Sequence, residues 1–170
     1  MANAVWTAAQ FNAHVRDNLN ETMPGKATTA GRWFVSQGAN SIAEREIASA
    51  TVNTSQTTTS LAYTDLATVG PSVTLTTGTR ALVFLNSGTS NTSANVQNSF
   101  SYAVSGATTI AASDTWRGLV DGVAAGAAPK FGTVHFVTNL TPGANTFTMK
   151  YKTGFGTATF YGRNIIVMAM

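Results

Sequence analysis

The side chains that could carry out chemistry are few and widely spaced in this chain of 170 residues. Its two histidines, His14 and His135, have no second histidine or carboxylate at the spacing of a local metal motif. Glu44 and Glu46 could form a carboxylate pair on one face of a strand, but Arg45 between them favours an ordinary exposed strand. The pattern predicts structural roles for these side chains and no metal or cofactor.

The body of the chain carries three further acidic residues, Asp65, Asp114 and Asp121. Calcium sites need several such oxygens, but no calcium-loop motif is present, and each Asp lies beside a turn, where it caps backbone groups. The chain has no nucleophile elbow, no phosphate-binding loop and no cysteine. A glycan hydrolase needs an acid and a base that converge in a cleft, so we expect that the protein is not an enzyme.

The strongest local signal is a capped amphipathic helix near the N-terminus. Thr7 is the N-cap candidate, and Gln10 three residues later completes a capping box. The apolar positions of the helix and its staple are Trp6, Phe11, Val15 and Leu19. A helix of about a dozen residues is marginal alone in water, so its apolar stripe needs a partner surface.

Beyond the helix, residues 32–36 and 41–48 are predicted to form a small hairpin or an extended segment. From residue 50 onward, short strand-like runs alternate with turn clusters, a cadence typical of a β-sandwich or jelly roll. The expected strands are residues 57–63, 72–77, 80–86, 99–104, 108–112, 133–138, 145–151, 157–161 and 164–168.

Two loops and one strand in this body have distinctive compositions. Residues 118–130 are rich in Ala and Gly and are predicted to be a long loop, and residues 154–156 are predicted to be a hairpin turn. The run 80–86 has a continuous apolar centre, which indicates a strand covered on both faces.

Charge divides the chain into two unlike parts. Residues 1–48 hold 8 of the 17 charged residues, whereas residues 49–170 hold only 9 in 122 positions. Soluble domains place charge on about a quarter of their residues, so a body this poor in charge suggests that much of its surface contacts other protein. We interpret residues 1–48 as a helix-containing docking arm and residues 49–170 as a β-sandwich (jelly-roll) body.

The net charge of +3 does not indicate a nucleic-acid partner, because the basic residues of the body are scattered instead of forming a dense stripe. The longest apolar runs, 81–85 and 165–170, are too short to span a bilayer, and residues 1–10 lack the pattern of a signal peptide. We therefore expect synthesis in a cytoplasm, no export signal and no membrane partner.

Seven segments carry a resemblance to a known family. They are VWTAAQFNAHVRDNL at 5–19, YTDL at 63–66, GPSVT at 70–74, TGTRALV at 77–83, SYAVSGATT at 101–109, LTPGANTF at 140–147 and RNIIV at 163–167. These segments resemble small virion structural proteins of tailed phages, especially those that infect actinobacteria. The resemblance implies a jelly-roll body that forms a homo-oligomer, expected as a trimer, with no enzymatic residues to carry over. The chain lacks the long shaft of a fibre protein.

Two virion roles follow from this resemblance. The first is a capsid decoration subunit that binds the phage major capsid protein only in the assembled shell and stabilises it by mass action. The alternative is a minor tail or tail-tip protein that contacts tail proteins and takes part in host-surface or glycan binding. The expected interface or docking anchors are Trp6, Phe11, Val15, Leu19, Trp33 and Phe34. The alternative interpretation is that these side chains pack inside their own subunit.

Overall fold

The structure is a computed structural model that describes residues 5–20, 26–39 and 41–170, without the side chains of Asp17, Leu19 and Asn20. The chain divides into two compact units, Met1–Glu46 and Ile47–Met170. The boundary expected from composition, after residue 48, falls inside the strand that opens the second unit.

The first unit begins with the capped helix. Helix α1 spans Ala8–Asn20. The backbone N–H of Thr7 donates to Oε1 of Gln10 over 3.0 Å, and the backbone N–H of Gln10 donates to Oγ1 of Thr7 over 3.2 Å. This reciprocal pair is the predicted capping box, and it provides acceptors for two backbone donors at the helix start.

The first unit also contains a two-stranded antiparallel hairpin, formed by β1 (Trp33–Gly38) and β2 (Ser41–Arg45). The Glu44 carboxylate accepts the backbone N–H and the hydroxyl of Thr28, and these hydrogen bonds lower the pKa of Glu44. Glu46 pairs instead with Arg32. The two glutamates therefore hold the preceding segment and do not form a carboxylate pair.

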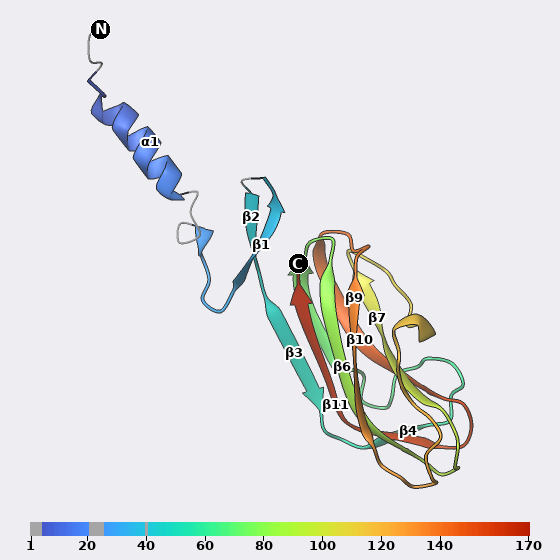
Figure 1. Cartoon of the computed structure of the whole chain (residues 1–170). Coiled ribbons are helices and arrows are strands. Elements are labelled where there is room, and N and C mark those ends of the chain that lie inside the picture. The colour runs from blue at the N-terminus through green and yellow to red at the C-terminus, as the bar shows by residue number, and fades with distance from the viewer. Residues whose placement is uncertain (1–4, 21–25, 40) are drawn as a thin grey trace. The chain divides into compact units, whose positions relative to one another are not determined.

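Eight strands of the second unit form a two-layer sandwich (Figure 1). In chain order they are β3 (Ile47–Val52), β5 (Ser72–Thr77), β6 (Ala81–Asn91), β7 (Asn98–Gly106), β8 (Gly118–Val120), β9 (Lys130–Val137), β10 (Gly143–Thr153) and β11 (Ala158–Ala169). The short strand β4 (Gln56–Thr58) also pairs with β11, and a 3-10 turn, η1 (Asp114–Trp116), precedes β8.

The order of these strands defines the fold. One sheet runs β3-β11-β6-β9 and the other runs β5-β10-β7-β8, and every neighbouring pair is antiparallel. If the eight strands are counted along the chain, the sheets read 1-8-3-6 and 2-7-4-5. This is the double-sheet, eight-stranded arrangement of a jelly roll, so the predicted fold class is confirmed.

The core lies between the two sheets and follows from alternation along each strand. In β10, Phe147, Met149 and Tyr151 are buried, whereas Thr148 and Lys150 between them are partly exposed. The rings of Tyr151 and Phe160 meet across the layers with centroids 4.9 Å apart. The sandwich is therefore closed by large side chains that face one another from both sheets.

Several strand predictions differ from the structure. Residues 108–112 make only an isolated bridge at Ile110, and of residues 57–63 only the first two lie in a strand. The predicted loop 118–130 contains β8. The predicted hairpin turn at 154–156 instead joins β10 to β11, which lie in different sheets. In each case the tertiary partner of the segment decided the outcome, and local composition did not reveal that partner.

A bulge in β11 places one charged residue inside the sandwich. The pairing of β11 with β6 shifts between Tyr161 and Asn164, and Gly162 within the shift has a φ of +52°. An extra residue at this point reverses the alternation of side chains. As a result Arg163 points inward and is fully buried.

The buried Arg163 guanidinium is held by neutral oxygens. Nη1 donates to the carbonyls of Thr68 (3.3 Å) and Gly70 (3.1 Å), and Nη2 donates to the carbonyl and hydroxyl of Thr54 and to Oε1 of Gln56 (3.1 Å). Its Cζ also lies 5.3 Å from the centroid of the Tyr151 ring. These contacts fasten the connection between β3 and β5 to the core.

We predict that Arg163→Met destabilises the fold by about 1.5–3 kcal/mol, because it removes the charge-assisted hydrogen bonds that tie the connection between β3 and β5 to β11. Urea denaturation followed by circular dichroism measures this loss. Arg80→Met is the matched control, since Arg80 is exposed and its replacement should change stability by about 0.5 kcal/mol or less. Equal losses in the two variants would contradict the role given to Arg163.

Candidate assembly interface and polar pocket

The expected docking residues lie on two separate elements of the first unit. Trp6, Phe11 and Val15, on and beside α1, have exposed fractions between 40 and 57 %. The side chain of Leu19 lies outside the described part of the chain. Trp33 and Phe34 are half-buried neighbours in β1, and neighbouring strand residues point to opposite faces. These two residues therefore do not contribute to one continuous surface.

A larger apolar surface lies on the second unit, where sequence reasoning did not place it. It is the outer face of the β3-β11-β6-β9 sheet, which we call the apolar sheet face. Strand register aligns its residues in rows across the four strands. The first two rows are Ile47, Met168, Leu82 and Phe136, then Ser49, Ile166, Phe84 and Val134.

The large side chains of this face are open to solvent within the second unit. Ile47, Phe84, Val134 and Phe136 have exposed fractions between 41 and 57 %. With strands about 4.8 Å apart and rows about 7 Å apart, the two apolar rows cover roughly 19 by 14 Å. Apolar patches of a few hundred Å² are often functional, and larger ones rimmed by polar residues mark interaction surfaces.

The surroundings of the apolar sheet face are polar and almost uncharged. The third row across the same strands is Thr51, Asn164, Asn86 and Gly132. A hollow of about 560 Å³ at this end is lined by Asn86, Phe84 and Val134 among others, with Lys130 at its edge. The arrangement is that of an interface core with a polar rim.

The sequence contained a partial signal for this surface. The continuous apolar centre of residues 80–86 indicated a strand covered on both faces. In the second unit β6 is covered on its inner face alone, because Val83 and Leu85 are buried whereas Phe84 is exposed. Together with β9 and β11, the strand leaves its second face exposed within this unit.

The outer face of the other sheet has the opposite character. Ser72 and Thr148 approach within 2.8 Å through their hydroxyls, and Thr74 and Thr146 do the same one row further along. This face is rich in small hydroxylated residues and carries the lysines of β10. The two outer faces of the sandwich are thus apolar on one side and polar on the other.

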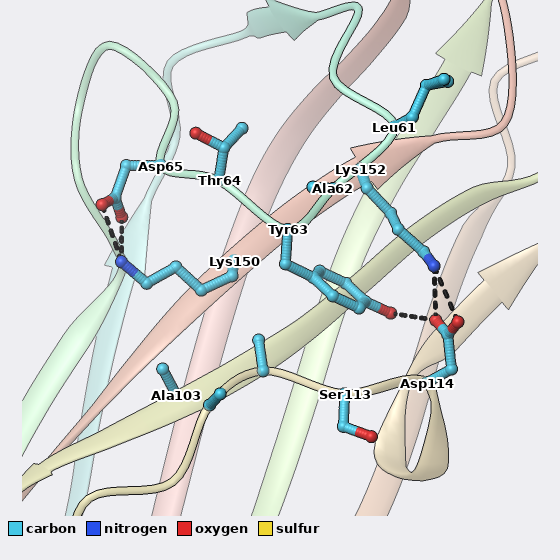
Figure 2. A pocket seen from close by; sticks show the side chains of 12 residues that line it. Leu61, Ala62, Tyr63, Thr64, Asp65, Ala103, Ser113, Asp114, Lys150 and Lys152 are labelled. Carbon is cyan, nitrogen blue, oxygen red and sulfur yellow. Dashed lines mark hydrogen bonds and ion pairs between the residues drawn. The ribbon is translucent and has the colours of Figure 1, made fainter.

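A pocket of about 630 Å³ opens on this polar face, between residues 61–65 and 111–114 (Figure 2). Lys150 Nζ lies 2.7 Å from both carboxylate oxygens of Asp65. Lys152 Nζ lies 2.7 Å from Asp114, which also accepts the hydroxyl of Tyr63 over 2.8 Å. Lys152 lies over the Tyr63 ring, 4.8 Å from its centroid. We call this the polar pocket.

The pKa values of two groups in the polar pocket, Asp114 and Tyr63, are shifted so that neither group changes its charge near neutral pH. The hydrogen bond from Lys152, followed by that from Tyr63, lowers the pKa of Asp114. Burial makes the largest contribution to raising the pKa of Tyr63, and the hydrogen bond to Asp114 makes the second largest. At neutral pH the pocket therefore holds an ionised carboxylate and a neutral phenol.

The remaining candidates for chemistry have structural partners. His135 Nδ1 lies 2.6 Å from the hydroxyl of Tyr102, and its ring stacks on Trp116 with centroids 4.9 Å apart. Burial lowers the pKa of His135. In the described ranges, no group of three or more His, Asp or Glu residues could hold a metal ion. No helix among them is long and apolar enough to cross a membrane.

The strand order and the two outer faces define a jelly-roll β-sandwich with one open apolar face. No protein-family model and no curated protein matches the chain. Among solved structures it is similar to a chain described as "Structure of infectious bursal disease virus Gx strain", with 9% identity and a TM-score of 0.49 over 79% of this chain. The match spans 36% of that chain. The fold class rests on strand order, and the likeness to phage virion proteins stays a prediction.

We predict that Tyr63→Phe raises the pKa of Asp114 toward its ordinary value, because one of the two leading hydrogen bonds to the carboxylate is lost. Since the folded pKa is lowered, Asp114 stabilises the fold above its unfolded pKa, and this contribution is lost as the pH falls through the folded value.

Carbon-detected NMR titration of the Asp114 carboxyl measures this shift. Tyr161→Phe is the control, since that hydroxyl donates to the carbonyl of Ala128 and not to a carboxylate. An Asp114 pKa that is the same in Tyr63→Phe and in the wild type would contradict the assignment.

Proposed function

We propose that the protein is a virion structural subunit that forms a homo-oligomer through the apolar sheet face and decorates the capsid shell. The observation that carries the proposal is this face itself, a sheet surface that the second unit leaves uncovered although its strands have the composition of covered ones. A charge-poor body supports the same conclusion, because surface that contacts protein needs little charge.

Burial energetics support a second copy of the chain as the partner. A large apolar side chain contributes about 1.5–3 kcal/mol when it is fully buried, and half-exposed ones such as Phe84 and Val134 have part of this still to gain. Association costs at least about 4 kcal/mol, so several of these side chains must be buried together. Two sheet faces packed about 10 Å apart meet this condition.

The charge pattern also favours a second copy. The three rows of the apolar sheet face contain no charged residue, and Lys130 lies just beyond them, opposite Gly88. Two copies can therefore bring these rows together without like charges in the centre of the contact, and Arg80, two residues before Leu82, lies beyond the first row. The face is smaller than the roughly 800 Å² per partner of a stable interface, so we propose that it forms the core of a larger contact. A trimer is the assembly implied by the sequence resemblance.

The first unit supports the shell-binding part of the proposal. Helix α1 presents Trp6, Phe11 and Val15 to solvent, and an isolated helix of this length needs a partner for such a stripe. Several such arms on one oligomer would raise its avidity for a repetitive shell. Jelly rolls recur in viral capsid domains, which is an analogy at the level of fold.

We predict that Val134→Glu dissociates the oligomer into 17.7 kDa monomers, because it places a charge in an apolar row of the sheet face, directly beside Phe84. Light scattering after size exclusion measures the mass, and circular dichroism verifies the fold. Phe155→Glu is the control, since Phe155 is a still more exposed apolar residue (69% against 57% for Val134) and lies in the connection between β10 and β11.

Two results would refute the oligomer. One is a wild-type chain that is monomeric at every concentration tested. The other is a Val134→Glu variant with unchanged mass. If hydrogen exchange then showed that the face is protected only when residues 1–46 are present, the first unit of the same chain would be its partner.

We predict that deletion of residues 1–30 abolishes binding to purified capsids while the oligomer survives. Co-sedimentation with particles measures the binding, and light scattering measures the oligomer. Intact binding would exclude docking by the arm, and loss of the oligomer would make the arm an oligomerisation element. The number of copies per particle, determined by quantitative mass spectrometry, separates the two virion roles: hundreds indicate the capsid, and a handful indicates the tail.

A further inference from the structure

The polar pocket is built as a preorganised site and not as an incidental hollow. Its wall, residues 61–65, belongs to the connection that Arg163 fastens at Thr54, Gln56, Thr68 and Gly70. The backbone of Thr64 also pairs with Tyr151 of β10 in both directions, over 3.0 Å. A site held on a rigid frame loses little conformational entropy when it binds a ligand.

The charges of the residues that line the pocket are paired. Lys150 faces Asp65 and Lys152 faces Asp114 at hydrogen-bond distance, and Arg117, beside the lining, lies 3.3 Å from Asp114. Figure 2 shows the Tyr63 ring between the two lysines. Because each of these charges already has a partner of opposite sign, the pocket presents no unpaired charge to an anion or to a cation.

The paired groups still have hydrogen-bonding capacity. An ammonium has three N–H donors, and each lysine uses two of them on its aspartate. Each carboxylate oxygen has more than one acceptor position, and Asp65 receives one donor on each oxygen. Donors and acceptors therefore lie side by side at both ends of the pocket. A hydroxyl group both donates and accepts, so neighbouring hydroxyls fit such pairs.

Besides the Tyr63 ring, small apolar groups line the space between these ends. They are Ala62, Ala103, Ala111 and Ala112, with Leu61 at the rim. Short side chains leave room for a flat ring whose C–H groups can pack on them. The volume of the pocket, about 630 Å³, lies within the range of small-molecule sites, about 300–1,000 Å³.

We propose that the polar pocket binds a neutral saccharide. The paired lysines and aspartates recognise adjacent hydroxyls, and the alanines receive the C–H face of the sugar ring. The site binds without cleaving, because a glycosidase acid needs a raised pKa whereas Asp114 has a lowered one. Jelly rolls also occur among lectins, an analogy of fold that agrees with the pocket but does not carry the proposal.

The test is an NMR titration of the ¹⁵N-labelled full chain with four neutral methyl glycosides, those of glucose, galactose, mannose and N-acetylglucosamine. Glucuronate serves as the anionic comparison. We expect at least one neutral sugar to shift the amides of residues 61–65 and 111–114, with a Kd on the order of 1 mM, and glucuronate to bind more weakly.

Ala103→Leu fills the floor of the pocket and should weaken binding of that sugar at least about tenfold. Ala144→Leu is the matched control, because Ala144 lies on the same outer face at the far end of β10, outside the pocket. If Ala103→Leu is unfolded, Lys152→Met, which removes donors without filling space, replaces it.

The proposal is overturned if no neutral sugar shifts these amides, or if the two alanine variants bind equally. It is also overturned if glucuronate binds more tightly than every neutral sugar. The oligomer mass should be unchanged in Ala103→Leu, since the apolar sheet face lies on the other side of the sandwich. Failure of the saccharide site therefore leaves the proposed assembly role intact, and the reverse also holds.

Discussion

The buried cation of Arg163 is the constraint on which the rest of the second unit depends. A guanidinium cannot lose its proton in a protein, so it must find acceptors wherever it is buried. Here the acceptors are oxygens of Thr54, Gln56, Thr68 and Gly70, all in the connection between β3 and β5. That connection passes from one sheet to the other, so its position determines how the two layers are joined.

The same constraint reaches the polar pocket. Gly70 O accepts both Arg163 and the hydroxyl of Tyr151, which ties the end of the connection to the core strand β10. The next outward residues of β10, Lys150 and Lys152, then meet Asp65 and Asp114. The buried charge of Arg163 thus helps to position Asp65, which belongs to the same connection, whereas Asp114 comes from the turn η1.

The two outer faces show how a single fold can separate its tasks. Threonine and serine hydroxyls bond to one another across β5 and β10, which lets that face remain in water. The corresponding positions across β6, β9 and β11 hold Phe84, Val134 and Ile166, whose side chains form no hydrogen bonds with water. A protein with one polar and one apolar outer face can associate through the apolar face and leave the polar face free for small ligands.

The sequence by itself determined the features that depend on neighbours along the chain. The capping box of Thr7 and Gln10 needs only a spacing of three residues. The alternation of β10 and the cadence of short strands were enough to predict a β-sandwich or jelly roll, and the resemblance to phage virion proteins favoured the jelly roll. The apolar run 80–86 predicted a strand covered on both faces, whereas the second unit covers β6 on its inner face alone.

Only the tertiary structure decided the sites. The bulge at Gly162 turns Arg163 inward. The local sequence pattern does not predict to which face of the sheet a residue points after a register shift. Asp65 and Lys150 are 85 residues apart in the chain and meet because β10 passes beneath the segment that follows β4. Pairings of this kind depend on which strands become neighbours, and that is set by the packing of the whole sandwich.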